Sequence, residues 1–63
     1  MTNQIHKYNI GDILAVQRRD YIAYLLIEDM DQHQYHFIDF NLNRRDKDSI
    51  WYVDNHKAIS RAA

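Results

Sequence analysis

Residues 21–27, YIAYLLI, and residues 35–40, YHFIDF, decide the fold. Both runs consist mainly of aromatic and aliphatic side chains, whose shapes suit a pleated strand. The residues between them, 29–33, include two aspartates, which tolerate the tight backbone of a turn. We therefore expect the two runs to pair as an antiparallel hairpin.

Two further runs, residues 13–16 (ILAV) and 50–53 (IWYV), have a similar composition, and residues 58–59 can add a short fifth strand. The polar residues 41–49 are expected to be a connection. With 63 residues there is room for one domain, so residues 1–63 are expected to form a single all-β unit. Its predicted core contains Ile13, Val16, Leu26, Ile38 and Trp51.

The alternative is an α+β fold with a helix at about residues 20–30. Asp20 would cap such a helix, and four apolar residues recur at helical spacing. A strand is favoured because the segment is short and leads through a turn into a second apolar run of matching length. The four apolar residues are Ile22, Leu25, Leu26 and Met30.

Residues 8–16 (YNIGDILAV) and 50–59 (IWYVDNHKAI) resemble two parts of SH3-like small β-barrels, the diverging turn with its following strand and the closing segment. Gly11 would allow a left-handed turn, and Asp12 would accept hydrogen bonds from the turn's amides. The resemblance implies an antiparallel barrel of about five strands. The aromatic ALYDY stretch of peptide-binding SH3 domains is absent, so a proline-rich ligand is not implied. Small barrels of this outline in bacteria and phages bind proteins, nucleic acid or their own copies.

Several functional classes lack the residues that they need. The chain has no cysteine, which removes disulfides, thiolate nucleophiles and cysteine-based zinc sites. His33 and His36 would point to opposite faces of a strand, so a shared metal is not expected. No serine lies in a glycine-rich elbow. We expect no enzymatic activity and no cofactor, and the short apolar runs predict a cytoplasmic protein without a membrane anchor.

Charge is segregated along the chain. Residues 20–43 carry five carboxylates without a lysine or arginine, a sum of −5, whereas residues 1–19 and 44–63 each sum to +2. If these parts lie on different faces, the molecule is dipolar, which favours association with a charged partner.

Aromatic residues make up 13% of the chain, more than so small a core can enclose. Tyrosine, tryptophan and arginine are the side chains that contribute most to protein interfaces. We therefore expect a non-enzymatic protein–protein interaction module, such as an adaptor, inhibitor or regulatory subunit, with self-association into a homodimer through a sheet that is apolar on both faces. The predicted protein-binding residues are Tyr24, Tyr35, Phe37 and Asp39 on a sheet face, with Asp29 and Asp31 in the adjoining turn.

The alternative function is nucleic-acid binding by arginine-rich loops. Arginines on loops would contact phosphates while a neighbouring tyrosine stacks on bases. The sequence pI of about 6.4 and the acidic middle disfavour this alternative. Its predicted contact residues are Arg18, Arg19, Arg44, Arg45 and Lys47.

Overall fold

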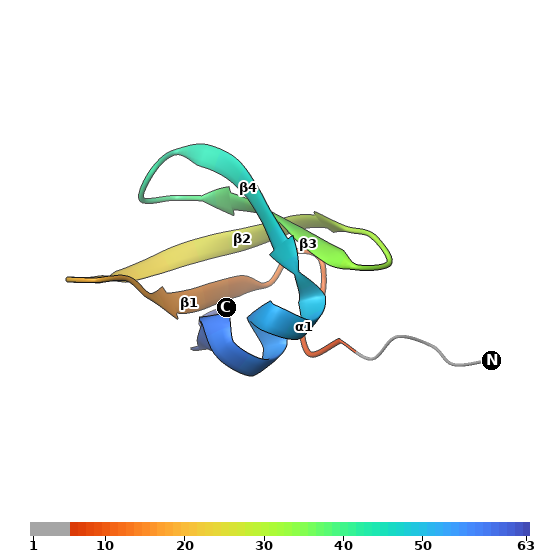
Figure 1. Ribbon diagram of the computed structural model, residues 1–63. Helices are drawn as coiled ribbons and strands as arrows, with labels where there is room; N and C mark the ends of the chain where they lie inside the picture. Colours follow the sequence, from red (N-terminus) through yellow and green to blue (C-terminus); the bar gives the residue numbers. More distant parts are fainter. Residues whose placement is uncertain (1–5) are drawn as a thin grey trace.

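Four strands follow one another as an antiparallel meander in the computed structural model, which describes residues 6–63 (Figure 1). A short helix, a π-helical turn and a last strand complete the chain, and β5 pairs with β1, which gives the order β4-β3-β2-β1-β5. The elements are β1 (Ile13–Gln17), β2 (Ile22–Met30), β3 (Gln34–Asp39), β4 (Arg44–Ser49), α1 (Ile50–Tyr52), η1 (Val53–Lys57) and β5 (Ala58–Arg61).

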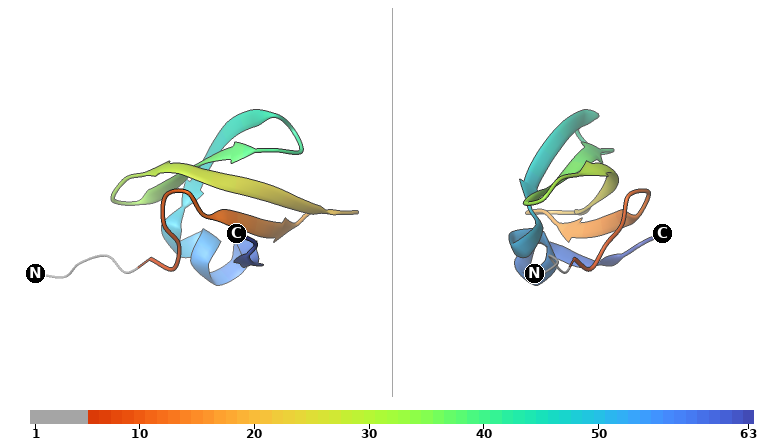
Figure 2. Two further views of the ribbon diagram at one scale, coloured as in Figure 1. Left: turned by 180° about the vertical axis from the view of Figure 1, so that it is seen from behind. Right: turned by 90° about the vertical axis from the view of Figure 1, so that its right-hand side faces the viewer.

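The sheet curls around its inner face, but it is not closed into a barrel (Figure 2). Both β4 and β5 are edge strands. The mainly antiparallel, all-β prediction is confirmed, and the alternative helix at residues 20–30 is wrong. The segment is a strand because β2 pairs on both sides, with β1 and with β3, and these ladders outweigh the helical spacing of its apolar residues.

The chain after β3 differs from the prediction. Residues 44–49, expected within a connection, form the edge strand β4. Its side chains are mostly charged, and its backbone pairs with that of β3. Residues 50–53, expected as a strand, are helical. The Ser49 side chain caps this helix by accepting a hydrogen bond from the Tyr52 amide, and the Ala58 amide closes the π-helical turn on the Val53 carbonyl.

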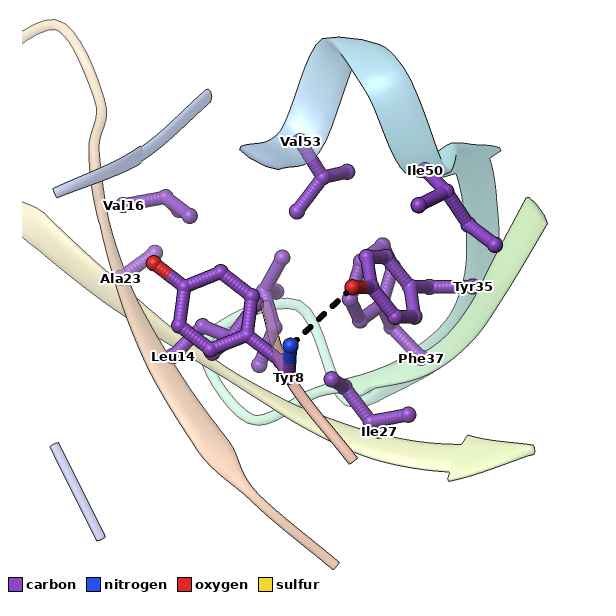
Figure 3. Packing of buried hydrophobic residues seen from close by; sticks show 10 residues of the cluster. Tyr8, Leu14, Val16, Ala23, Ile27, Tyr35, Phe37, Ile50 and Val53 are labelled. Atoms are coloured by element: carbon purple, nitrogen blue, oxygen red, sulfur yellow. Dashed lines mark hydrogen bonds between the residues drawn. The ribbon is translucent and has the colours of Figure 1, made fainter. Parts of the chain in front are cut away.

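The core lies on the inner face of the sheet, under the helical segment (Figure 3). Val16 is buried as predicted, but Ile13, Leu26 and Ile38 lie half-buried on the opposite face. Trp51 is 64% exposed, so its placement in the core is wrong. The buried apolar cluster is Tyr8, Leu14, Val16, Ala23, Leu25, Ile27, Tyr35, Phe37, Ile50 and Val53.

The turn before β1 has the predicted local structure. Gly11 has a φ of 95°, in the region that favours glycine, and the Asp12 carboxylate accepts a hydrogen bond from the Asn9 amide at 2.9 Å. The Asp12 amide in turn donates to the Asn9 carbonyl at 3.0 Å. These contacts fix the direction in which the chain enters β1.

The buried Tyr35 hydroxyl connects three segments. It donates a hydrogen bond to the Asp54 carboxylate at 2.9 Å and accepts one from the Tyr8 amide at 3.2 Å. The second oxygen of Asp54 accepts from the Lys7 amide at 3.0 Å. Tyr35 therefore joins residues 7–8 and η1 to the beginning of β3.

Replacing Tyr35 with Phe should lower the free energy of unfolding by about 1 to 3 kcal/mol, because the Tyr8 amide loses its acceptor. Burial, together with the hydrogen bond to Asp54, raises the pKa of the Tyr35 phenol above its ordinary value of 10.0. The folded state therefore disfavours the phenolate. The stability that Tyr35 contributes is complete below pH 10 and is lost as pH rises above it. Urea unfolding at neutral and at alkaline pH should show a smaller alkaline loss for Tyr35→Phe than for wild type; equal losses would contradict this assignment.

Candidate interaction surfaces

The helical segment exposes an apolar surface, here named the Trp51 surface, made of Trp51, Tyr52, His56 and Ile59. Ile50 and Val53, three residues apart, point into the core, so the residues between them point to solvent. Trp51 is 64% exposed and Tyr52 is 45% exposed. Ile59, on the edge strand β5, is also exposed.

The π-helical turn holds these side chains together. It places the His56 ring between two aromatic rings, with centroid distances of 5.0 Å to Trp51 and 5.6 Å to Tyr52. The Asn55 side-chain amide donates a hydrogen bond to the Trp51 carbonyl at 2.8 Å. The aromatic side chains are thus arranged before a partner arrives, which reduces the conformational entropy lost on binding.

A groove of about 380 Å³ adjoins the Trp51 surface. Tyr52, His56 and Ile59 line one part of it, and the cationic side chains of Arg18 and Lys57 line another. Lys57 is paired with Asp48 at 3.1 Å across the opening between β4 and β5. Asp48 lines the groove as well, so the groove combines an apolar wall with the Lys57–Asp48 ion pair and the partly exposed Arg18 guanidinium.

A second apolar surface covers the outside of the sheet, opposite the core. The strand register aligns Ile13, Leu26 and Ile38 in one row across β1, β2 and β3. Tyr24 lies beside Phe40, whose amide donates to the Tyr24 carbonyl at 3.1 Å. This outer face consists of Ile13, Ile22, Tyr24, Leu26, Ile38 and Phe40, of which Ile22, Tyr24 and Phe40 are each more than 40% exposed.

The predicted protein-binding face does not exist as one surface. Tyr24 is exposed on the outer face, but Tyr35 and Phe37 are completely buried on the inner one, so the prediction that they form an exposed face is wrong. Asp31 is exposed in the β2–β3 turn, as expected, whereas Asp29 is exposed within the last part of β2, where it pairs with His36. The sequence pattern did not predict that Trp51, Tyr52 and Ile59 are exposed. The available signal was Ser49, a residue suited to begin a helix at residue 50.

Asp39 was also predicted to lie on the exposed face and is instead buried, with 1% of its surface accessible. Its carboxylate accepts a hydrogen bond from the Arg18 guanidinium at 2.9 Å and others from the amides of Asn41 and Leu42. The residue thus holds the β1–β2 turn against the β3–β4 turn. Its role in this structure is to position two turns.

Four of the arginines predicted for nucleic-acid binding lie near the β1–β2 and β3–β4 turns, which share one end of the meander (Figure 1). Arg18 is paired with Asp39, and Arg45 is paired with Glu28 at 2.9 Å. Arg19 and Arg44 are exposed. The fifth predicted residue, Lys47, lies further along β4, opposite His36.

The acidic β2–β3 turn lies at the other end of the meander (Figure 1). Within it, Asp31 accepts hydrogen bonds from the His36 imidazole at 2.8 Å and from the amides of His33 and Gln34. These bonds lower the pKa of the Asp31 carboxyl from 3.8 to about 2. Asp29 and Asp31 thus lie at the end of the sheet opposite to Arg18, Arg19 and Arg44, whereas Asp20 and Asp39 of the same acidic segment lie among the arginines.

Acid titration should detect the Asp31 turn. Because the folded pKa is lowered, the stability that Asp31 contributes is present above pH 3.8 and is lost as pH falls toward 2. Replacing Asp31 with Asn should reduce the dependence of unfolding on pH in this interval, measured by circular dichroism in urea at several acidic pH values. An unchanged dependence would show that Asp31 is not preferentially ionised in the folded state.

Comparison of the chain with models of protein families, with curated proteins and with solved structures found no match. Within residues 6–63, no three His, Asp or Glu side chains gather closely enough to hold a metal ion. Across the same residues, no helix has the length and apolar character needed to cross a membrane.

Proposed function

We propose that the chain is a non-enzymatic protein–protein interaction module that binds its partner through the Trp51 surface. The observation that carries this proposal is the exposure of the only tryptophan, 64%, on a turn whose neighbouring residues anchor it to the core. Tryptophan and tyrosine are strongly enriched among residues that dominate binding energy. An exposed apolar cluster with a polar margin is the usual arrangement of such an interface.

The groove suggests the chemistry of the partner. An apolar side chain would pack against Tyr52 and Ile59, and a neighbouring carboxylate would approach the cationic side of the groove. Arg18 remains 30% exposed and donates a nitrogen of its planar guanidinium to Asp39. Its other N–H groups are suited to a carboxylate. We therefore favour a partner segment with an apolar residue beside an acidic one, as in an adaptor or regulatory complex.

We also propose that the fold is of the SH3-like small-barrel type. Three features support it: the left-handed Gly11 turn before β1, the helical turn between β4 and β5, and the pairing of β5 with β1. Small barrels of this outline serve many functions, so the fold class leaves the choice of partner to the exposed side chains.

The test compares wild type with Trp51→Ala as baits in a pull-down from the host lysate, with nuclease present. Wild type should recover a defined protein, and Trp51→Ala should weaken binding of that protein at least about 30-fold in a direct titration. The matched control is Phe40→Ala, which removes an exposed aromatic ring from the outer face and should leave this affinity unchanged. Equal binding by wild type and Trp51→Ala would contradict the proposal.

Single-stranded nucleic acid is the second candidate, because the arginine-bearing turns lie next to exposed Tyr21, Tyr24 and Phe40. If it binds there, affinity for an oligonucleotide should fall steeply with salt, and Arg19→Ala or Arg44→Ala should each reduce the slope by about one unit. Recovery of nucleic acid alone when nuclease is omitted from the same pull-down, with its loss in high salt, would favour this candidate over the protein partner.

A further inference from the structure

The outer face of the sheet has no covering element within the described residues, although it is apolar over three strands. Tyr24, at 44% exposure, and Phe40, at 51%, lie next to each other where β2 passes the end of β3. Single exposed apolar side chains are normal in folded proteins, but a group of six on one face marks an interaction surface. This surface is separate from the Trp51 surface, which lies on the helical segment and β5.

The charges at the two ends of the outer face indicate which molecule binds to it. Exposed Arg19 and Arg44 lie at the end formed by the β1–β2 and β3–β4 turns, where the exposed carboxylate of Asp20 offsets one of the two positive charges. Exposed Asp29 and Asp31 lie at the opposite end, near the β2–β3 turn, where the exposed Lys47 of β4 offsets one of the two negative charges. A face that is apolar in its middle, positive at one end and negative at the other is complementary to a second copy of itself turned end for end.

We propose that two copies of this chain associate through their outer faces about a two-fold axis that crosses β2 near Tyr24. In this arrangement the apolar rows pack face to face with their strands roughly aligned, as in a β-sandwich. Each Arg19 end lies opposite an Asp29 end, and this contact occurs twice because the interface is isologous. The inference stands apart from the proposed function, since the Trp51 surface of each copy stays exposed.

Pairing of two copies through their β4 edges would be a less favourable way to form a dimer. Five of the six residues of β4 are charged, which is a common protection of an open edge. On the outer face the Arg45–Glu28 ion pair lies beside Ile38, whereas Ile13, Tyr24 and Phe40 carry no charge. The face, and not the β4 edge, is thus the surface on which association removes apolar side chains from water.

Analytical ultracentrifugation of the full chain tests the association. Wild type should shift from monomer to dimer with rising concentration, and Tyr24→Ser should raise the dimer dissociation constant at least about 30-fold. Phe40→Ser is the second outer-face variant, and Tyr52→Ser is the matched control, because it removes an exposed tyrosine from the Trp51 surface. The control should dimerise like wild type. Circular dichroism confirms that each variant is folded, and a wild type that stays monomeric at every concentration would overturn the inference.

Charge exchange tests the end-for-end arrangement. Arg19→Glu and Asp29→Lys should each weaken homodimerisation, by about 2- to 5-fold per contact, because like charges then meet at both ends. An equal mixture of the two variants should restore association, since opposite charges again face each other in the mixed dimer. No gain on mixing would rule out the proposed arrangement.

The dimer and the proposed function can fail separately. If wild type is monomeric but still binds a protein through Trp51, the dimer alone is refuted. If wild type forms the dimer but Trp51→Ala does not weaken partner binding, the proposed function alone is refuted.

Discussion

Replacing Phe37 with Ala is expected to lower the free energy of unfolding by about 3 to 5 kcal/mol. Phe37 is completely buried at the centre of the inner face, where its ring lies 6.0 Å from that of Tyr35. Lys57 also places its ammonium group 5.6 Å from the centre of the Phe37 ring. A domain of this size has a total stability of only about 5 kcal/mol or somewhat more, so the variant should be mostly unfolded at moderate temperature.

Trp51→Ala is the matched comparison, because it removes a larger ring. Since Trp51 is mostly exposed, its loss should change stability by no more than about 0.5 kcal/mol. Thermal and urea unfolding of both variants decide the point. A large loss of stability in Trp51→Ala, with a small one in Phe37→Ala, would mean that the two faces of the fold are assigned the wrong way round.

Asp39→Ala is expected to produce the second large effect, a loss of about 3 kcal/mol. The substitution leaves Arg18 without its carboxylate and leaves the amides of Asn41 and Leu42 without their acceptor. Asp39→Asn should be less damaging, because its side-chain oxygen can still accept from these amides while the charge is lost.

A double-mutant cycle separates the ion pair from the rest of the site. If Arg18 and Asp39 stabilise the fold together, Arg18→Ala should reduce stability much less in the Asp39→Ala background than in wild type. Additive effects of the two substitutions, measured by urea unfolding, would show that the pair is not coupled and that Asp39 acts through the turn amides alone.

The hairpin of β2 and β3 could be predicted from sequence because two apolar runs of matching length flank an aspartate-containing turn. The turn before β1 could be predicted because Gly11 and Asp12 supply a left-handed backbone and a hydrogen-bond acceptor. In both places the local chemistry of a few neighbouring residues determines the structure.

The choice of core face could not be made in the same way. Residues 35–40 are apolar on both faces, and a strand's two-residue period does not say which face is buried. Exchanging the faces moved Tyr35, Phe37 and Asp39 from the predicted surface into the core. Ile38 and Leu26 moved in the opposite direction, and this is why the outer face was not recognised as a surface.

The strand β4 and the helical segment depended on longer-range effects. Arg44–Ser49 has the composition of a loop, and it forms a strand because β3 offers an unpaired edge for its backbone. Residues 50–53 have the composition of a strand, but Ser49 caps a helix there, and Ile50 and Val53 complete the core. The exposure of Trp51 follows from that change of secondary structure.

Hydroxyl-radical footprinting, read residue by residue by mass spectrometry, tests the central claim that the Trp51 surface binds the partner. The chain is labelled alone and with the protein recovered by the wild-type pull-down, at one fixed concentration of the chain. The account predicts that oxidation of Trp51 and Tyr52 falls strongly when the partner is added, while oxidation of Tyr24 and Phe40 on the outer face does not change. Unchanged oxidation of Trp51 in the complex would contradict it.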